Sequence, residues 1–460
     1  MNEGIGAAYL FTAICFVLSL KLMNSPKSAR FGNGVAVVGM AAAIAATFFL
    51  PDIGVRNIGW IVISLAIGAV VGVGSARKVQ MTAMPQMVAL FNGLGGGAVA
   101  LVATIEFSKA EHPSTGALLT MILSTMIGAI SFSGSLIAFG KLQELLRGRA
   151  ISFPGQKAFN LSLLGLVCLL AIYIIATGGG LGVFVLFLVL SLAAGVLLVL
   201  PIGGADMPVV ISLLNSFTGV AAALAGFVLG NTALLIGGGL VGASGLILTL
   251  QMCKAMNRSL DHVIFGALGG AEATALAAER DTKGSVRSYS IEDAAIIFAN
   301  ADSVIIVPGY GMAVAQAQHA VKEFADKLAA RGASVKYAIH PVAGRMPGHM
   351  NVLLAEADVP YDQLYDLDDI NSEFPETDIA LVIGANDVTN PAARYDQLSP
   401  IYGMPILDVD KAKTCIVCKR SMNPGYAGID NELYTMPNTV MLFGDAKSTV
   451  QKLSAAIDNY

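Results

Sequence analysis

Charged side chains make up only 13% of this 460-residue chain, and they are scarcest in its first half. Residues 1–258 carry 13 basic and 6 acidic side chains, whereas residues 259–460 carry 15 and 26. With 55% hydrophobic residues and a mean hydropathy of +0.69, this composition excludes a protein that is soluble over its whole length. The pattern indicates a lipid-embedded part joined to a soluble part near Arg258.

Cysteine is also rare, and three of the five cysteines (Cys15, Cys168 and Cys253) lie in apolar stretches. This excludes a disulfide framework and favours ordinary packing roles. Cys415 and Cys418 have no second pair to complete four ligands, so we expect no metal site. The amino terminus lacks the basic segment of a secretory signal, so the first apolar run is predicted to be a retained spanning helix.

Nine apolar stretches are each close to the roughly 20 residues that a helix needs to cross a bilayer. They cover residues 4–23, 33–51, 57–76, 84–105, 117–140, 159–177, 181–201, 208–230 and 233–254. The connections on one side carry eleven Lys or Arg side chains, among them Lys27, Arg30 and Lys141, and those on the other side carry two. By the positive-inside rule, the amino terminus lies outside and the soluble part lies in the cytoplasm. We therefore expect a multi-pass protein of the inner membrane, with residues 1–258 as its membrane domain.

The soluble part begins with a linker over residues 259–289, in which one short helix is expected near residues 263–268. Ser290-Ile-Glu-Asp293 has the form of a capping box and predicts a helix from Ile291 to Asn300. Strands are then expected at 303–308, 334–340, 378–384, 414–419 and 438–443 and helices at 312–331, 348–357 and 446–457, with a further strand and helix between 361 and 374. The predicted fold is a polytopic α-helical membrane bundle followed by a soluble α/β Rossmann-like domain with a parallel sheet, at residues 290–460.

A glycine motif, Gly309-Tyr310-Gly311-Met-Ala-Val314, stands where the first strand turns into a helix. Gly309 permits a tight turn, Gly311 would let the backbone approach a pyrophosphate, and the helix N-terminus supplies N–H groups. The motif alone is weak, but its place between a buried strand and a helix predicts dinucleotide binding. A bare structural turn is the alternative.

The bound nucleotide is predicted from the ends of two later strands. Tyr337-Ala-Ile-His340 ends without the acidic residue that NAD-binding units usually place on the ribose. Lys419-Arg420-Ser421 follows another strand, and two cations with a hydroxyl could hold a 2′-phosphate. NADP is therefore favoured over NAD, while a solvated strand end would also explain the two cations. The glycine-containing loop over residues 422–428 could fold over a bound cofactor.

Several long strings resemble the beta-subunit family of proton-translocating nicotinamide nucleotide transhydrogenases. They are GGADMPVV at 203–210, GYGMAVAQAQ at 309–318, HPVAGRMPGHMN at 340–351, GAND at 384–387 and KRS at 419–421. The resemblance covers essentially the whole chain. It implies a proton-conducting membrane sector, NADP(H) on this chain, and NAD(H) on a separate alpha subunit so docked that the two nicotinamides touch. The expected assembly is a dimer of alpha–beta units in a lipid bilayer, without nucleic acid.

The same resemblance implies which residues contact NADP(H). They are Gly309, Tyr310, Gly311, Val314, Val342, Ala343, Gly344, Arg345, Met346, Pro347, Gly384, Ala385, Asn386, Asp387, Val388, Gly403, Met404, Lys419, Arg420, Ser421, Met422, Asn423, Pro424, Gly425, Tyr426, Asp445 and Ala446. Lys419, Arg420 and Ser421 would hold the 2′-phosphate. Asp387 is the candidate catalytic residue near the nicotinamide, and the loop through Gly425 and Tyr426 would be a lid.

Polar groups inside a membrane are costly and usually functional, which makes Asn92, Ser135, Asp206 and Asn215 candidates for a proton pathway. Each has a structural alternative, because Asp206 could cap the helix that follows it and the others could hydrogen-bond neighbouring helices. Some members of the family have a histidine where this chain has Asn92. We therefore expect an alpha-subunit helix to contribute the titratable group.

Two other classes of protein remain open from the sequence. One is a channel or transporter gated by a cytoplasmic nucleotide-binding domain, although no potassium-channel filter of the Thr-Val-Gly-Tyr-Gly kind occurs. The other is a membrane-anchored NADPH-binding scaffold, in which Asp206 and Asn215 are only structural.

Overall fold

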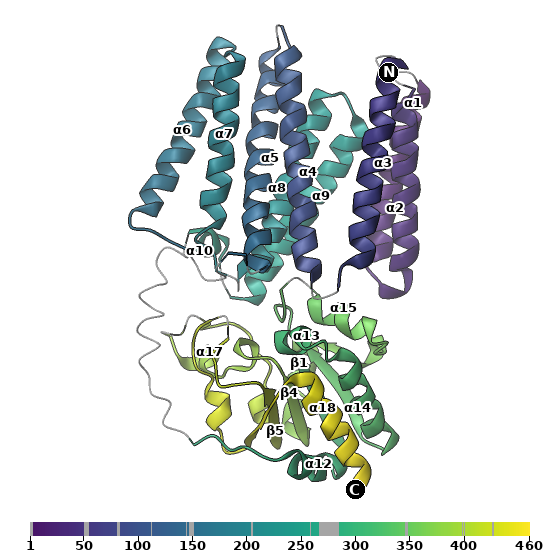
Figure 1. Cartoon of the computed structure of the whole chain (residues 1–460), viewed down its shortest axis with the longest axis vertical. Coiled ribbons are helices and arrows are strands. Elements are labelled where there is room, and N and C mark those ends of the chain that lie inside the picture. Colours follow the sequence, from purple (N-terminus) through teal and green to yellow (C-terminus); the bar gives the residue numbers. More distant parts are fainter. Residues whose placement is uncertain are drawn as a thin grey trace. The chain divides into compact units, whose positions relative to one another are not determined.

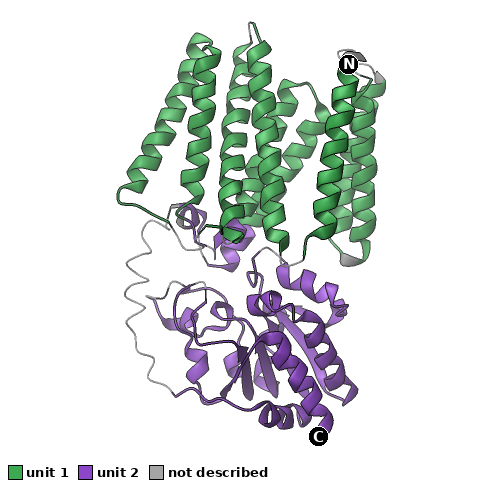
Figure 2. Cartoon of the chain, in the orientation of Figure 1, with its two compact units in different colours: residues 1–147, 151–201, 210–249 green, residues 148–150, 202–209, 250–460 purple. Residues whose placement is uncertain are grey.

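The computed structural model describes residues 3–49, 55–80, 83–111, 113–143, 145–146, 151–203, 206–257, 259–265, 285–345, 348–397, 399, 401–425 and 427–460. The chain divides into two compact units (Figures 1 and 2). The first holds residues 1–147, 151–201 and 210–249, and the second holds residues 148–150, 202–209 and 250–460. Most of the predicted linker lies outside the described residues. In its described part, α10 (Leu260–Phe265) corresponds to the helix expected near residues 263–268.

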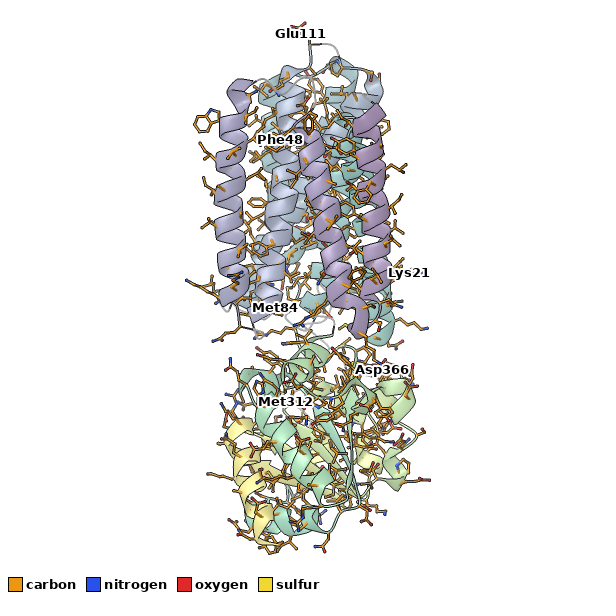
Figure 3. All side chains as sticks on the ribbon, turned by 90° about the vertical axis from the view of Figure 1, so that its right-hand side faces the viewer. Lys21, Phe48, Met84, Glu111, Met312 and Asp366 are labelled. Carbon is orange, nitrogen blue, oxygen red and sulfur yellow. The ribbon has the colours of Figure 1, made fainter. Side chains whose placement is uncertain are left out.

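Within the described ranges, nine helices are long and apolar enough to cross a membrane. They are α1 (Glu3–Met23), α2 (Pro26–Thr47), α3 (Val55–Lys78), α4 (Met84–Lys109), α5 (Thr115–Leu142), α6 (Gln156–Thr177), α7 (Leu181–Val199), α8 (Met207–Val228) and α9 (Thr232–Ala255). The nine predicted spans are confirmed. In the first unit, Lys21 and Met84 lie at one end of the helices and Glu111 lies at the opposite end (Figure 3).

The start of α2 was predicted wrongly, at residue 33 instead of Pro26. Proline is favoured in the first turn of a helix, where its missing N–H costs nothing. Lys27 and Arg30 made the segment look like a loop. They lie on the first turns of α2, where long cationic side chains can reach the edge of the bilayer.

Close contact between α4 and α5 depends on two glycines that face each other. A Cβ atom on Gly96 would lie 2.9 Å from the carbonyl oxygen of Gly128, and one on Gly128 would lie 2.7 Å from the carbonyl oxygen of Gly96. Side chains at these positions would force the helices apart. Because lipid provides no hydrophobic drive between helices, such backbone contact is a main source of their association.

Lys141 was predicted to be a loop cation, but it is buried at the end of α5. Its side chain is 4% exposed, and its ammonium donates to the carbonyl oxygens of Leu200 at 2.5 Å and Val199 at 3.4 Å. The last carbonyls of a helix have no partner within the helix. Lys141 therefore provides a hydrogen-bond donor for the carbonyl groups at the end of α7 and links that helix to α5.

The described residues of the second unit form a six-stranded parallel sheet (Figure 1). Its strands are β1 (Ser303–Pro308), β2 (Ser334–Ile339), β3 (Leu364–Asp366), β4 (Ile379–Ile383), β5 (Thr414–Lys419) and β6 (Thr439–Phe443), in the order β3-β2-β1-β4-β5-β6. This order confirms the Rossmann-like prediction. The strand order reverses between β1 and β4, so their carboxyl ends form the switch point at which open α/β sheets bind ligands.

Helices cover the sheet. They are α12 (Ile291–Ala299), α13 (Tyr310–Val314), α14 (Gln318–Ala330), α15 (His349–Glu356), α16 (Leu367–Ile370), α17 (Ala392–Tyr395) and α18 (Ala446–Ala456). On one face α12, α14 and α18 pack together, with Phe298 of α12 edge-on to Phe324 of α14 at 5.1 Å between ring centres. On strand β1 the alternate residues Ile305 and Val307 join a separate core with Phe374 and Leu407.

The capping box at the start of α12 is confirmed. The Ser290 hydroxyl accepts a hydrogen bond from the Asp293 N–H at 3.1 Å, and the Asp293 carboxylate accepts one from the Ser290 N–H at 3.3 Å. These two bonds satisfy N–H groups that a helix start would otherwise leave without a partner.

The single helix predicted at residues 312–331 is wrong, because the chain breaks it into α13 and α14. Gln316 adopts a left-handed conformation with φ of 49°. The Gln316 N–H donates to the Ala313 carbonyl and the Ala317 N–H donates to the Met312 carbonyl. These two bonds are the hydrogen-bond pattern of a Schellman helix end. Glycine usually marks such an end. Here glutamine holds the position, so no residue type marks the break.

Asp378 joins three segments at the amino ends of the strands, away from the switch point. Its carboxylate accepts hydrogen bonds from the N–H groups of Asp302 and Ser303, both at 3.0 Å, and from the Lys413 ammonium at 2.8 Å. The Lys413 hydrogen bond is the main reason why the pKa of Asp378 is lowered to about 2. The ionised form of Asp378 is therefore favoured by folding.

We expect Asp378→Asn to lower the thermal unfolding midpoint of the full chain in detergent by about 2–5 °C at pH 7. The unfolded pKa of Asp lies near ~3.9, so the stabilisation is full above that pH and is lost as the pH falls toward the folded value. The loss on substitution should thus be smaller at pH 3, as measured by circular dichroism. Asp368→Asn, at an exposed position, is the control. Equal losses at both pH values would rule out this ionic contribution.

Candidate functional site

The switch point is built from two loops that touch through their backbones. The Gly309 N–H donates to the Ile383 carbonyl and the Gly311 N–H donates to the Gly384 carbonyl, both at 2.9 Å. A Cβ on Gly311 would lie 2.7 Å from the Gly384 Cα, and Gly384 has a φ of +67°. Glycine is therefore needed here so that the loop after β1 can pack on the loop after β4. The predicted role of Gly311, backbone approach to a pyrophosphate, remains a prediction.

The loop after β2 brings a cation to the same end of the sheet. Arg345, which is partly buried, places its guanidinium 4.4 Å from the ring centre of Tyr310. This cation–π contact joins two of the predicted cofactor residues that lie on separate loops. Val342 and Gly344 are also partly buried, and Ala343 is buried. Met346 and Pro347 lie outside the described residues.

Two buried histidines hold that loop, and sequence reasoning missed both roles. His340 Nε2 lies 2.7 Å from the Pro405 carbonyl oxygen, and His340 Nδ1 accepts the Val342 N–H at 3.2 Å. His349 Nδ1 accepts the Arg345 N–H at 3.0 Å. Burial lowers the pKa of each imidazole to about 4, so both are neutral at physiological pH. A single histidine carries no pattern from which such a role could be predicted.

The loop after β4 connects Asp387 to the predicted lid. The Asp387 carboxylate accepts the Ala427 N–H at 3.0 Å. Asn386 is held as well, because the Asn431 side-chain amide donates to the backbone carbonyl of Asn386 at 2.9 Å. Val388 is buried in the sheet core. The catalytic candidate and the far side of the lid are thus in direct contact.

Lys419 lies at the carboxyl end of β5 among neutral oxygens. Its ammonium donates to the Asn423 carbonyl at 2.6 Å and to the Tyr434 hydroxyl at 3.3 Å. With its amide oxygen turned toward Lys419, Asn386 accepts a third hydrogen bond at 3.2 Å. Burial lowers the pKa of Lys419 to about 8, while the charges of Asp387 and Asp430 oppose that shift. An anion placed here would find a partly desolvated cation.

The other predicted residues differ in exposure. Those that follow Lys419 are exposed, namely Arg420, Ser421, Met422, Asn423 and Pro424, and Gly425 is partly buried. Val314 is 43% exposed at the end of α13. Met404 is buried in a cluster on which Val342 and Ala427 pack, and Gly403 precedes it with a φ of +76°. Tyr426 lies outside the described residues.

Asp445 has a local structural role in addition to the predicted one. It is the N-cap of α18, where its carboxylate accepts the N–H groups of Lys447 at 3.1 Å and Ser448 at 3.2 Å. Ala446 follows it and is buried. This is the usual way in which a carboxylate satisfies a helix N-terminus.

In the membrane part, Asn92 and Ser135 belong to one buried polar cluster. The Asn92 amide donates to the Ser135 hydroxyl at 2.9 Å. Ser131, one turn earlier on α5, lies 3.4 Å from that amide, donates to the Leu214 carbonyl at 2.8 Å and lies 2.6 Å from the Thr218 hydroxyl. The cluster therefore joins α4, α5 and α8. Ser131 and Thr218 were missed, because Ser and Thr are common in spanning helices.

Asp206 and Asn215 are the other two residues predicted for the proton pathway. Asp206 directly precedes α8 and is 9% exposed. Asn215 lies two turns into α8 and is partly buried. Asp206 is the only acidic residue between Glu144 and Asp261 in the sequence. Because a carboxylate in so long an apolar region is costly and usually functional, Asp206 stays a candidate for the proton pathway.

The Rossmann sheet with its glycine loops, joined to the nine spanning helices of the described chain, defines a multi-pass membrane protein with a dinucleotide-type domain. A sequence model of the NAD(P) transhydrogenase beta subunit family matches residues 5–456, and the chain belongs to that family. Two relatives from Rhodospirillum rubrum, one of them from strain ATCC 11170, carry the name NAD(P) transhydrogenase subunit beta. Each is 53% identical, over 98% of this chain and 98% of the relative.

Family membership confirms the resemblance drawn from the sequence. The chain is the beta subunit of an NAD(P) transhydrogenase, a member of an oxidoreductase family that uses nicotinamide nucleotides, and the beta designation implies an alpha partner. The alternative of a gated channel or transporter is not supported. The nine apolar helices fit a multi-pass membrane protein.

Proposed function

We propose that the second unit binds NADP(H) and that the alpha subunit carries NAD(H). The main support is the partly buried ammonium of Lys419, whose hydrogen-bond acceptors Asn423, Tyr434 and Asn386 are all neutral. Arg420 and Ser421 follow it directly. A 2′-phosphate would give this ammonium a charged hydrogen-bond acceptor. The end of β2 instead carries the buried His340, so the carboxylate that would favour NAD is absent from that position.

The proposed cofactor contacts are the residues predicted from the sequence. The loops at 309–314, 342–347 and 384–388 would follow the dinucleotide across the switch point, with Arg345 and Tyr310 toward its phosphates. Residues 403–404, 419–426 and 445–446 would complete the pocket. The proposal that this pocket binds the phosphates of a dinucleotide rests on the cationic side chains Lys419 and Arg345. Both lie at the carboxyl end of the sheet.

The loop over residues 422–428 would serve as the lid. It is held by the Lys419 ammonium on the Asn423 carbonyl and by the Asp387 carboxylate on the Ala427 N–H. With the amide oxygen of Asn386 turned toward Lys419, that oxygen also accepts the Gly425 N–H. Breaking these contacts would free the loop to open. Asp387 would therefore act near the nicotinamide end, as a group that couples the lid to the reacting part of the pocket.

The bound nicotinamides supply the hydride donor and acceptor, so no residue of this chain needs to act as a general base. The protein would contribute orientation and exclusion of water. We propose that proton movement drives NADP⁺ reduction by alternately opening and closing this site. Such coupling is reciprocal, because a proton that changes cofactor affinity must itself bind differently when the cofactor is present.

The proposed proton pathway comprises Asn92, Ser135, Asp206 and Asn215. The Asn92 Oδ1 atom is buried and accepts no hydrogen bond from the described residues. An unsatisfied buried acceptor costs about 1–3 kcal/mol, which a donor from an alpha-subunit helix or a water would recover. We therefore propose that the alpha subunit contributes the titratable group and that the beta chain alone cannot pump.

The membrane domain is proposed to span residues 1–258, the linker 259–289 and the NADP(H) domain 290–460. The excess of cations on one set of connections supports an outside amino terminus and a cytoplasmic NADP(H) domain in the inner membrane. The assembly would be a dimer of alpha–beta units in lipid.

Asp206→Asn tests the coupling. In liposomes with the alpha subunit, we expect the variant to lose at least about 90% of gradient-driven hydride transfer, because no other carboxylate stands in this apolar region. NADPH affinity, measured by titration calorimetry, should change less than about twofold. Glu106→Gln, at the Lys109 end of α4, is the control and should keep its coupling. Coupled transfer at the unsubstituted rate would remove Asp206 from the pathway and favour a structural role.

A further inference from the structure

Tyr434 occupies a position next to the proposed phosphate site that no sequence motif marks. It lies on η8 (Glu432–Thr435), a short turn before β6, and its side chain is 2% exposed. Its ring belongs to the sheet core together with Val417 and Met441. Burial is the largest reason why the pKa of Tyr434 is raised, so the hydroxyl stays protonated at physiological pH. Packing in the core fixes the position of the Tyr434 ring, and the hydroxyl of that ring lies at the carboxyl ends of β4 and β5.

The hydroxyl meets the ends of two neighbouring strands. It lies 3.3 Å from the Lys419 ammonium, at the end of β5, and 2.8 Å from the side-chain amide of Asn386, just after β4. The Lys419 ammonium also lies 4.7 Å from the centre of the Tyr434 ring. Asn431 supports the same arrangement, since its amide donates to the Asn386 carbonyl at 2.9 Å.

We propose that Tyr434 is a positioning residue for Lys419 and so helps to set the preference for a dinucleotide with a phosphate monoester on its ribose. The proposal rests on the proposed function, because it requires the phosphate to bind at Lys419. Tyr434 itself need not touch the ligand.

The physical reason is pre-organisation. A lysine side chain has four rotatable bonds, and fixing it during binding costs part of the affinity. Tyr434 and Asn386 hold the ammonium in place before the ligand arrives, and the aromatic ring adds a cation–π attraction. Without the hydroxyl, the ring remains but the ammonium loses one of its acceptors. The loss should be felt by a ligand that contacts Lys419 and not by one that lacks the phosphate.

Tyr434→Phe tests this role, because it removes the hydroxyl and keeps the ring in the core. In titration calorimetry on the full chain in detergent, we expect the Kd for NADPH to rise by about 5- to 10-fold and the Kd for NADH to change less than about twofold. Tyr365→Phe is the matched control, since its ring lies 4.9 Å from another lysine ammonium, that of Lys336. It should leave both Kd values unchanged.

The same titrations on Lys419→Met and on the double variant separate the possible failures. If Tyr434 acts through Lys419, Tyr434→Phe should have no further effect on the NADPH-to-NADH ratio in the Lys419→Met background. Equal weakening of both nucleotides, or none, with Tyr434→Phe alone would overturn the role of Tyr434 only, provided that Lys419→Met still weakens NADPH. If Lys419→Met leaves NADPH binding unchanged, the phosphate site and this inference both fail.

Discussion

Gly384→Ala is expected to weaken NADPH binding by at least about 100-fold, the largest single effect on the proposed site. The new Cβ would lie 2.6 Å from the Gly311 carbonyl carbon and 2.6 Å from the Met312 nitrogen. Both are backbone atoms, so no side chain can move to make room. The φ of +67° adds strain for any residue with a Cβ. The two loops at the switch point would have to separate, and titration calorimetry on the full chain would measure the loss.

Gly332→Ala is the matched control for this substitution. Gly332 also has a positive φ, of +99°, but a Cβ there would meet nothing within 4 Å. It should therefore lower stability by about 1 kcal/mol without changing the Kd for NADPH. If Gly384→Ala bound NADPH as tightly as Gly332→Ala, close packing of the two loops would not be required for binding.

Lys419→Met is expected to have the second largest effect. A hydrogen bond between charged groups contributes about 1.5–3 kcal/mol, which corresponds to a loss of NADPH affinity of about 10- to 100-fold. NADH has no 2′-phosphate and should bind as before. Methionine keeps most of the apolar stem of the side chain but lacks the ammonium, so the hydrogen bond and the cation–π contact with Tyr434 are removed. Lys452→Met, at an exposed position on α18, is the control.

The preference for NADPH over NADH should also weaken as the pH rises. Because burial lowers the pKa of Lys419 to about 8, the ammonium is charged at pH 7 and progressively neutral above pH 8. The NADPH-to-NADH affinity ratio should therefore fall between pH 7 and pH 9.5, and this fall should be absent in Lys419→Met. An unchanged ratio across that range, or equal loss of both nucleotides on substitution, would place the phosphate elsewhere.

Much of the architecture was predictable because it repeats along the sequence. The spanning helices follow from apolar runs of the required length, and the parallel sheet follows from alternating strands and helices. The contact between Gly309 and the loop after β4 was not predictable, although the glycines themselves were noticed. The motif indicates that there is no room for a side chain at Gly311. It does not distinguish a ligand from another loop as the group that fills the space.

Single residues that act through long-range contacts were not predictable. Tyr434 is 15 residues from Lys419 in the sequence, and Ser131 is 87 from Thr218, so no local spacing connects them. Gln316 ends a helix in a conformation for which glycine is the usual signal. Lys141 looked like a loop cation, because charge alone does not reveal that the carbonyls of another helix surround it.

We propose that NADP(H) occupancy and proton movement across the membrane are coupled. The most direct test of this coupling is hydride transfer from NADH to thio-NADP⁺ by this chain and the alpha subunit in liposomes, with and without an imposed proton gradient. We expect the gradient to accelerate the transfer several-fold and a protonophore, or omission of the alpha subunit, to remove the acceleration. Active hydride transfer whose rate is indifferent to the gradient would contradict the proposal.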